Sequence, residues 1–219
     1  MKSIIEANPA ICKTLEIGCA YGISSLFICL SAEGRCNFSH TIIDPFQFSQ
    51  WKGIGVNNLK LAGVQNYKLV EKKSEFALPE LLEKGEGKFD FIFIDGWHTF
   101  DHTLVDCFYS TRLLRVGGIL VIDDVAYPSV ARVVNYLKKY PCYKEIASIA
   151  TFESKGISIE TRSREGSSGF SFKSPNKKIL RIVQKLLSKF VFNKRGVGMI
   201  ALQKIAEDNR NWNWHNEFF

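Results

Sequence analysis

The sequence predicts an α/β fold, in which a doubly wound, mostly parallel seven-stranded sheet carries helices on both faces. Short apolar runs rich in Ile, Val and Phe alternate along the chain with segments whose apolar side chains recur at helical spacing. Glycine, proline or aspartate follows most of these segments. Residues 89–125 hold the clearest example, a strand, a helix and a second strand. The two strands of such a unit run parallel, which favours an open α/β sheet.

The first strand is expected over residues 13–17, where it leads into the turn Gly18-Cys19-Ala20-Tyr21-Gly22 and a helix over 23–32. A strand, a glycine turn and a helix in this order bring backbone N–H groups to a place that a nucleotide can approach closely. The glycines are not spaced as G-x-G-x-x-G, so an NAD-dependent enzyme is disfavoured.

The second strand is expected over residues 39–43 and ends at Asp44-Pro45. In open α/β folds an acidic residue at this place holds a ribose diol. The alternative is that Asp44 only forms a turn or a cap, which the following proline also favours.

The remaining elements follow from the same two patterns. Helices are expected over 49–62, 75–84 (with Ser74 as a cap), 101–114, 128–139 and 176–191, and strands over 67–70, 89–94, 118–122, 143–149 and 197–203. Gly117-Gly118 should end the helix over 101–114. A hairpin over 150–162 and a polar loop over 163–174 would precede the helix over 176–191. Residues 1–219 are expected to form a single domain.

Carboxylates follow both strands of the stretch 89–125, Asp95 after the first and Asp123-Asp124 after the second. Because the carboxyl ends of parallel strands meet at one edge of a sheet, the three side chains should lie close together. Crowded carboxylates repel one another unless a cation lies between them, and Mg²⁺ prefers oxygen ligands. The three residues are therefore candidate magnesium ligands. The alternative is that one or two of them cap the helices that follow.

Length and composition limit the class of protein. The 219 residues suffice for one α/β domain with a sizeable core, and no apolar run reaches the roughly 18–20 residues that span a bilayer. The first residues lack the apolar core of a secretory signal. Six cysteines are scattered without a C-x-x-C pair, which is typical of buried reduced thiols. These features indicate a cytoplasmic protein.

The net charge of +7 comes from one segment, because residues 166–206 contain nine Lys or Arg and no Asp or Glu. Most of this charge belongs to an expected basic insertion over about 150–195. Its helix over 176–191 has one apolar stripe, which should pack on the domain or form a homodimer. Contact with an anionic membrane surface is the alternative. Nucleic acid is not an expected partner, since no known binding motif is present. The aromatic tail over 211–219 should pack on the domain or cover the site as a lid.

Over residues 13–125 these pieces resemble the class I S-adenosylmethionine-dependent methyltransferases, whose fold is Rossmann-like. The resemblance is strongest to the metal-dependent O-methyltransferases of small molecules, of the catechol type and of the macrocin or sugar type. It rests on Leu15-Glu16-Ile17-Gly18-Cys19-Ala20-Tyr21-Gly22-Ile23-Ser24, Asp44, Asp95-Gly96-Trp97-His98 and Asp123-Asp124.

The resemblance implies S-adenosylmethionine as the cofactor, with Gly18 and Gly22 close to its methionine part, Ser24 at its carboxylate, Asp44 at its ribose and Trp97 against its adenine. The full set implied for the cofactor is Glu16, Gly18, Cys19, Ala20, Tyr21, Gly22, Ser24, Asp44, Ser74, Asp95, Gly96 and Trp97. The resemblance also implies Mg²⁺ or a similar divalent cation at Asp95, Asp123 and Asp124.

Two residues depart from the relatives. The catechol type has a general-base lysine at the position of His98, and the sugar type usually has Asp at the position of Trp97. A neutral imidazole can accept a proton near pH 7, so His98 is the candidate catalytic base. The alternatives are that His98 begins the next helix or contacts the cofactor.

The sequence therefore predicts a methyltransferase that uses S-adenosylmethionine and a divalent metal to methylate a hydroxyl of a small molecule, such as a diol, a sugar or a phenol. Two other interpretations stay open. One is a metal-independent methyltransferase, and the other is a catalytically silent cofactor-binding or scaffold protein.

Overall fold

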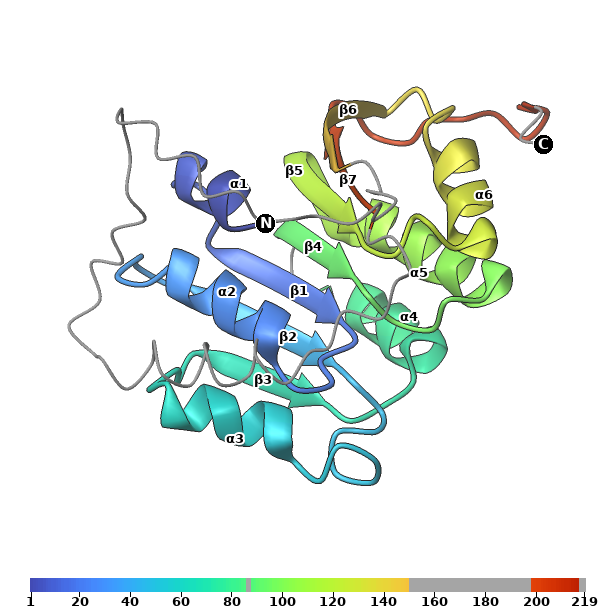
Figure 1. Cartoon of the computed structure of the whole chain (residues 1–219). Coiled ribbons are helices and arrows are strands. Elements are labelled where there is room, and N and C mark those ends of the chain that lie inside the picture. The colour runs from blue at the N-terminus through green and yellow to red at the C-terminus, as the bar shows by residue number, and fades with distance from the viewer. Residues whose placement is uncertain (86–87, 150–197, 217–219) are drawn as a thin grey trace, which may run out of the picture.

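The computed structural model describes residues 1–85, 88–149 and 198–216, and contains one seven-stranded sheet (Figure 1). The strands are β1 Lys13–Ile17, β2 Ser39–Ile43, β3 Tyr67–Val70, β4 Phe89–Ile94, β5 Leu114–Ile122, β6 Tyr143–Ile149 and β7 Met199–Lys204. They lie in the order β3-β2-β1-β4-β5-β7-β6. Strand β7 is antiparallel to both of its neighbours, and the other neighbouring pairs are parallel. The predicted doubly wound, Rossmann-like sheet is confirmed.

The helices cover both faces of the sheet (Figure 1). They are α1 Lys2–Ala7, α2 Ile23–Ser31, α3 Ile54–Leu61, α4 Ser74–Glu83, α5 Phe100–Leu113 and α6 Pro128–Leu137. Side chains of α1, α2 and α3 share a core with Phe91 and Val121, whereas side chains of α4, α5 and α6 share a second core with Ile92 and Leu120. Successive side chains of a strand point to opposite faces, so β4 and β5 contribute to both cores.

Four of the parallel strands end in register at one edge of the sheet. The residue after each strand donates its N–H to the last residue of the neighbouring strand: Asp44 to Val70 (3.2 Å), Gly18 to Ile43 (2.9 Å), Asp95 to Ile17 (2.9 Å) and Asp123 to Ile94 (3.0 Å). The parallel ladder thus continues one residue beyond the strands. It places Asp44, the glycine turn, Asp95 and Asp123 side by side, and the sequence predicts this common edge for Asp95 and Asp123.

Some element boundaries differ from the sequence-based expectation. Helix α5 ends at Leu113 and β5 begins at Leu114, so Gly117 and Gly118 lie inside the strand and do not end the helix. Gly117 has a φ of 83°, and the pairing of β4 with β5 shifts register near this point, so the glycines belong to an irregular strand start. Helix α3 begins at Ile54 and not at residue 49, because Gly53 precedes it in a left-handed conformation (φ 68°). The short helix α1 was not predicted.

The described part of the aromatic tail packs on the domain. The ring of Trp214 lies 5.9 Å from that of Tyr136 and 5.7 Å from that of Tyr140, and the guanidinium of Arg210 lies over Tyr140. This position supports packing and not a lid. The basic insertion over about 150–195, with its expected hairpin, loop and helix, lies outside the described residues. No helix among the described residues is long and apolar enough to cross a membrane.

A fully buried lysine at the end of β7 provides a test of the packing. The ammonium group of Lys204 donates to the carbonyl oxygens of Thr111 (2.9 Å) and Leu114 (3.0 Å) and pairs with Glu207 (2.6 Å). Lys204→Met leaves both carbonyl groups without this donor. We expect it to lower the free energy of unfolding by about 2–4 kcal/mol, measured by denaturant titration.

The matched control is Lys144→Met, which changes an exposed lysine on the neighbouring strand β6. We expect Lys144→Met to change the free energy of unfolding by no more than about 0.5 kcal/mol. Equal stability of the two variants would contradict a structural role for Lys204.

Candidate active site

The turn after β1 lies directly against the end of β4. A Cβ atom added to Gly18 would lie 1.9 Å from the carbonyl oxygen of Asp95, and Gly18 has a φ of 89°. The close approach and the left-handed backbone both require glycine at this position. The turn therefore places backbone without a side chain at the edge of the sheet where the parallel strands have their C-terminal ends.

Asp44 ties this turn to the end of β2. Its side chain is almost completely buried, and its Oδ2 accepts the N–H groups of Cys19 (3.1 Å) and Ala20 (2.9 Å). Its Oδ1 accepts the N–H of Phe46 (2.8 Å). Asp44 thus stabilises a turn, which was the alternative to ribose binding in the sequence analysis. It also lines a cavity.

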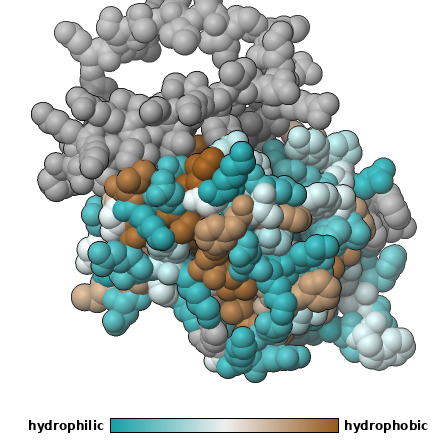
Figure 2. Space-filling model, turned by 90° about the horizontal axis from the view of Figure 1, so that it is seen from below, coloured by the Kyte–Doolittle hydropathy of each residue, from teal (hydrophilic) through white to brown (hydrophobic). Residues whose placement is uncertain are grey.

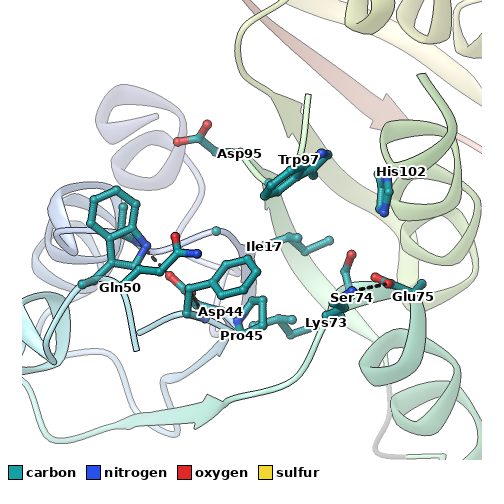
Figure 3. Close-up of a pocket in the computed structure, with 16 residues that line it drawn as sticks. Ile17, Asp44, Pro45, Gln50, Lys73, Ser74, Glu75, Asp95, Trp97 and His102 are labelled. Atoms are coloured by element: carbon teal, nitrogen blue, oxygen red, sulfur yellow. Dashed lines mark hydrogen bonds and ion pairs between the residues drawn. The ribbon is translucent and has the colours of Figure 1, made fainter. Parts of the chain in front are cut away.

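This cavity has a volume of about 470 Å³ and lies between the turn after β1, the end of β2, the start of α4 and the turn after β4 (Figure 3). Seven of the twelve residues predicted for the cofactor line it: Gly18, Ala20, Asp44, Ser74, Asp95, Gly96 and Trp97. In Figure 3, Asp95 and Trp97 lie on one side of the cavity, and Asp44 and Pro45 lie on another. The rings of Phe46 and Trp97, which both line this space, have centroids 6.3 Å apart and planes tilted by 50°.

The other five predicted cofactor residues do not line the cavity. Glu16 is fully buried behind the turn, where it contacts the hydroxyl of Ser25 and Nε2 of His40 (3.1 Å). The ring of Tyr21 packs on Trp51, with 4.9 Å between centroids. Cys19, Gly22 and Ser24 belong to the turn and to the start of α2. The structure thus gives Glu16 a place in the core.

Nine residues that line the cavity were not predicted as site residues: Ile17, Ile43 and Pro45 at the strand ends, and Phe46, Gln50, Trp51, Lys73, Glu75 and His102. Phe46, Gln50 and Trp51 lie in the segment between β2 and α3, part of which was expected to belong to a longer helix. Two aromatic residues close behind an acidic strand end were an available signal. Lys73 and Glu75 flank Ser74, and His102 follows Trp97 in the chain, but nothing in their spacing distinguished them.

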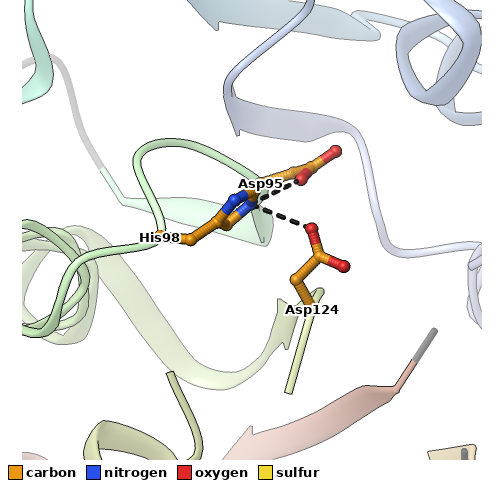
Figure 4. Close-up of side chains that lie close together, drawn as sticks. All are labelled: Asp95, His98 and Asp124. Atoms are coloured by element: carbon orange, nitrogen blue, oxygen red, sulfur yellow. Dashed lines mark ion pairs between the residues drawn. The ribbon is translucent and has the colours of Figure 1, made fainter. Parts of the chain in front are cut away.

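Asp95, His98 and Asp124 bring their side chains together beside this cavity (Figure 4). Nε2 of His98 lies 3.0 Å from Oδ2 of Asp124 and 3.5 Å from Oδ1 of Asp95. Asp124 and, to a smaller degree, Asp95 raise the pKa of His98 to about 10. The imidazole ring stacks on Tyr127, with centroids 5.2 Å apart and planes at 6°. His98 therefore carries the positive charge between these carboxylates when no other cation is bound.

Asp123 lies next to this group but, contrary to the prediction, is not one of its converging donors. Its Oδ1 accepts the backbone N–H of Asp124 (2.8 Å), and the three-donor group found among the described residues does not include it. Burial and, next, the charge of Asp95 raise the pKa of Asp123 to about 7. Burial also raises the pKa of Asp95. The predicted crowding of three carboxylates is present, but His98 replaces Asp123 in the converging set.

The converging donors fit a divalent cation. The ligand atoms of Asp95, His98 and Asp124 all lie within 4.8 Å of one another. The buried Nε2 of His98 is within ion-pair distance of both carboxylates, but no group among the described residues completes a hydrogen bond with it. Two carboxylates and an imidazole are a donor set that divalent metals accept.

A comparison with protein families matches residues 15–125 of this chain to a model described as a methyltransferase domain. Among curated proteins, catechol O-methyltransferase B of Danio rerio is 30% identical over 145 residues, which are 64% of this chain and 52% of that protein. The chain thus spans about half the length of the curated relative that it matches.

Solved structures show the same fold. The O-methyltransferase of Bacillus cereus, in complex with SAH, has a TM-score of 0.64 at 14% identity, over 93% of this chain and 78% of that chain. The O-methyltransferase TomG of Streptomyces achromogenes, in complex with SAM, has a TM-score of 0.64 at 16% identity, over 94% of this chain and 78% of that chain. At these identities the likeness establishes the fold alone.

The close approach of Gly18 to β4 can be tested by substitution. We expect Gly18→Ala to lower the free energy of unfolding by at least about 3 kcal/mol, because the added carbon meets backbone and not a movable side chain. Thermal and denaturant unfolding measure this loss.

Gly34→Ala is the matched control, since Gly34 has a similar φ of 80° but nothing within 4 Å of an added Cβ. Gly34→Ala should lower the free energy of unfolding by only about 1–2 kcal/mol, because the residue keeps a left-handed backbone conformation. Similar losses in the two variants would show that the turn does not depend on this contact.

Proposed function

This chain belongs to the methyltransferase domain family, and from that premise we propose that it transfers the methyl group of S-adenosylmethionine to a hydroxyl oxygen of a small molecule, assisted by a divalent cation. The observation that carries the proposal is the position of the Asp95–His98–Asp124 group at the rim of the cavity next to the glycine turn. Asp95 belongs to both, so the group that holds the cofactor and the group that would hold the cation share a residue.

The cavity supports the cofactor part of the proposal. A nucleoside would place its ribose at Asp44, whose Oδ1 accepts one N–H among the described residues and so has room for a further donor. Its base would lie near Phe46, Trp97 and Ser74, all of which line the cavity. When bound, S-adenosylmethionine supplies an activated methyl group, and a divalent cation lowers the pKa of a hydroxyl beside it.

The residues of the chain would then orient the acceptor. Asp95 and Asp124 would hold the cation, so an acceptor oxygen next to them lies near the cofactor cavity, in reach of an in-line approach. His98 is the proposed proton acceptor, because a cation held by Asp95 and Asp124 would replace the positive charge of the imidazole, whose Nε2 lies 3.0–3.5 Å from these carboxylates, and would leave the ring neutral. Asp123 would stabilise the backbone of Asp124 through its hydrogen bond and would add negative charge to the site.

The acceptor is proposed as a small molecule with neighbouring hydroxyl groups. The curated relative is named for catechol, which is an aromatic diol. Two adjacent oxygens suit a cation that keeps open coordination positions. Sugars and phenols belong to the same proposed class, and a panel of such acceptors would identify the substrate.

One observation favours a second candidate, a metal-independent methyltransferase. A protonated His98 already offsets one of the two negative charges of Asp95 and Asp124, so the two carboxylates depend less on a metal for charge balance. Activity that survives EDTA would support this candidate, whereas activity that EDTA removes and Mg²⁺ restores would support the metal-assisted reaction.

The proposed cation site can be tested with two neighbouring variants. Asp124→Ala should abolish the stimulation of turnover by Mg²⁺, because it removes one of the two converging carboxylates. Asp123→Ala should weaken the stimulation less, since Asp123 contacts backbone. Both should bind S-adenosylhomocysteine without metal as the unaltered protein does. Full metal stimulation in Asp124→Ala would remove the metal proposal, and equal loss in Asp123→Ala would make Asp123 a ligand.

The role of His98 can be separated from metal binding. We expect His98→Asn to lower kcat by about 10²–10⁴, the usual contribution of a general base. The Mg²⁺ concentration that gives half-maximal stimulation should stay unchanged. A large rise in that concentration with little loss of kcat at saturating metal would instead make His98 a ligand.

A further inference from the structure

Gln47 is a fully buried amide between the segments that form the cofactor side of the cavity. Its Nε2 donates to the carbonyl oxygen of Ala20 (3.0 Å) and to Oδ2 of Asp44 (3.3 Å). Its Oε1 accepts the N–H groups of Gly55 (2.9 Å) and Val56 (3.4 Å). Both hydrogens and the oxygen of the amide are therefore used, and one side chain joins the turn after β1, the end of β2 and the start of α3.

The contacts with Ala20 and Asp44 form a closed ring. Ala20 donates its N–H to Oδ2 of Asp44 (2.9 Å) and accepts from Gln47 through its carbonyl oxygen, while Gln47 also donates to Asp44. The position of the proposed ribose-binding carboxylate relative to the glycine turn is thus fixed from two sides. Neither Ala20 nor Asp44 can shift without breaking a bond of this ring.

Gln47 also forms hydrogen bonds with the start of α3. The residue before the helix is Gly53, which has no side chain to cap it, and the amide oxygen of Gln47 accepts two N–H groups of the first turn instead. A Cβ added to Gly55 would lie 2.6 Å from the carbonyl oxygen of Ala20 and 2.9 Å from Oε1 of Gln47. The helix start therefore packs directly against the glycine turn, and Gln47 forms hydrogen bonds with both.

We propose that Gln47 is a positioning residue that sets the spacing of Ala20, Asp44 and α3, and thereby the affinity for the cofactor. It does not line the cavity itself, so it acts through Asp44 and the turn. The proposal rests on the proposed function, because the cofactor at this site is taken to be S-adenosylmethionine.

Two substitutions separate the roles of the amide. Gln47→Leu removes all four hydrogen bonds, whereas Gln47→Glu keeps the shape and the acceptor for α3 but replaces the donor that faces Ala20 and Asp44. The control is Thr111→Val, which removes buried hydrogen bonds to Cys107 and Tyr143 in a part of the molecule that does not line the cavity.

The measurement is the dissociation constant of S-adenosylhomocysteine, by calorimetry, together with the melting temperature. We expect both Gln47 variants to raise the dissociation constant about tenfold or more. The KM for S-adenosylmethionine should rise in parallel, with a much smaller change in kcat. Thr111→Val should lower the melting temperature without changing the dissociation constant. Unchanged cofactor affinity in a folded Gln47→Glu protein would overturn the proposal.

Hydrogen exchange of the unaltered protein gives a test that does not depend on the variants folding. S-adenosylhomocysteine should slow exchange of the Gly55 and Val56 amides, which bond to Gln47 and do not line the cavity. Unchanged exchange with bound ligand would overturn the proposal for Gln47 alone. Absence of any binding by the unaltered protein would overturn the proposed function and this inference with it.

Discussion

The structure depends on a parallel backbone ladder that continues past the ends of β2, β1, β4 and β5. Four N–H groups, from Asp44, Gly18, Asp95 and Asp123, bond to the last carbonyl groups of the neighbouring strands. These bonds involve only backbone, so they fix where each strand end lies, although the approach of Gly18 to Asp95 leaves no room for a side chain at that position. The side chains at these positions then decide what the edge can bind, and here they are one glycine and three aspartates.

Two different sites share this edge. On one side, the bare backbone of the glycine turn and the buried carboxylate of Asp44 border a cavity large enough for a nucleoside. On the other side, Asp95 and Asp124 face each other with His98 between them. Since charged groups interact strongly where water is partly excluded, the imidazolium and a divalent cation would compete for these carboxylates. The metal-assisted reaction requires that the cation displaces the charge of His98 from these carboxylates. In a metal-independent reaction the protonated His98 would supply the positive charge instead.

Much of this arrangement could be predicted from the sequence. Strand β4 is buried on both faces and is a nearly continuous apolar run, and the bounds predicted for β1, β2 and β4 are those of the structure. Parallel strands end at a common edge, so the grouping of Asp95, Asp123 and Asp124 followed from their positions alone. The start of α3 was missed because a left-handed Gly53, and not the apolar period, decides where that helix begins.

Other features depend on contacts that no local pattern contains. The converging group contains His98 and not Asp123, whose carboxylate accepts a hydrogen bond from the backbone of Asp124. The burial of Glu16 follows from its partners Ser25 and His40, which come from two other elements. Gln47 resembles any polar residue of a loop in the sequence, and its four bonds exist only because α3 and the glycine turn meet around it.

One sheet edge is proposed to form both a cofactor cavity and a cation site, which share Asp95. Calorimetric titration of S-adenosylhomocysteine, with and without Mg²⁺, tests this arrangement. We expect binding in both conditions, with a different affinity or enthalpy when Mg²⁺ is present. Binding that is indifferent to Mg²⁺ would contradict the coupling of the two sites, and no binding in either condition would contradict the cofactor site itself.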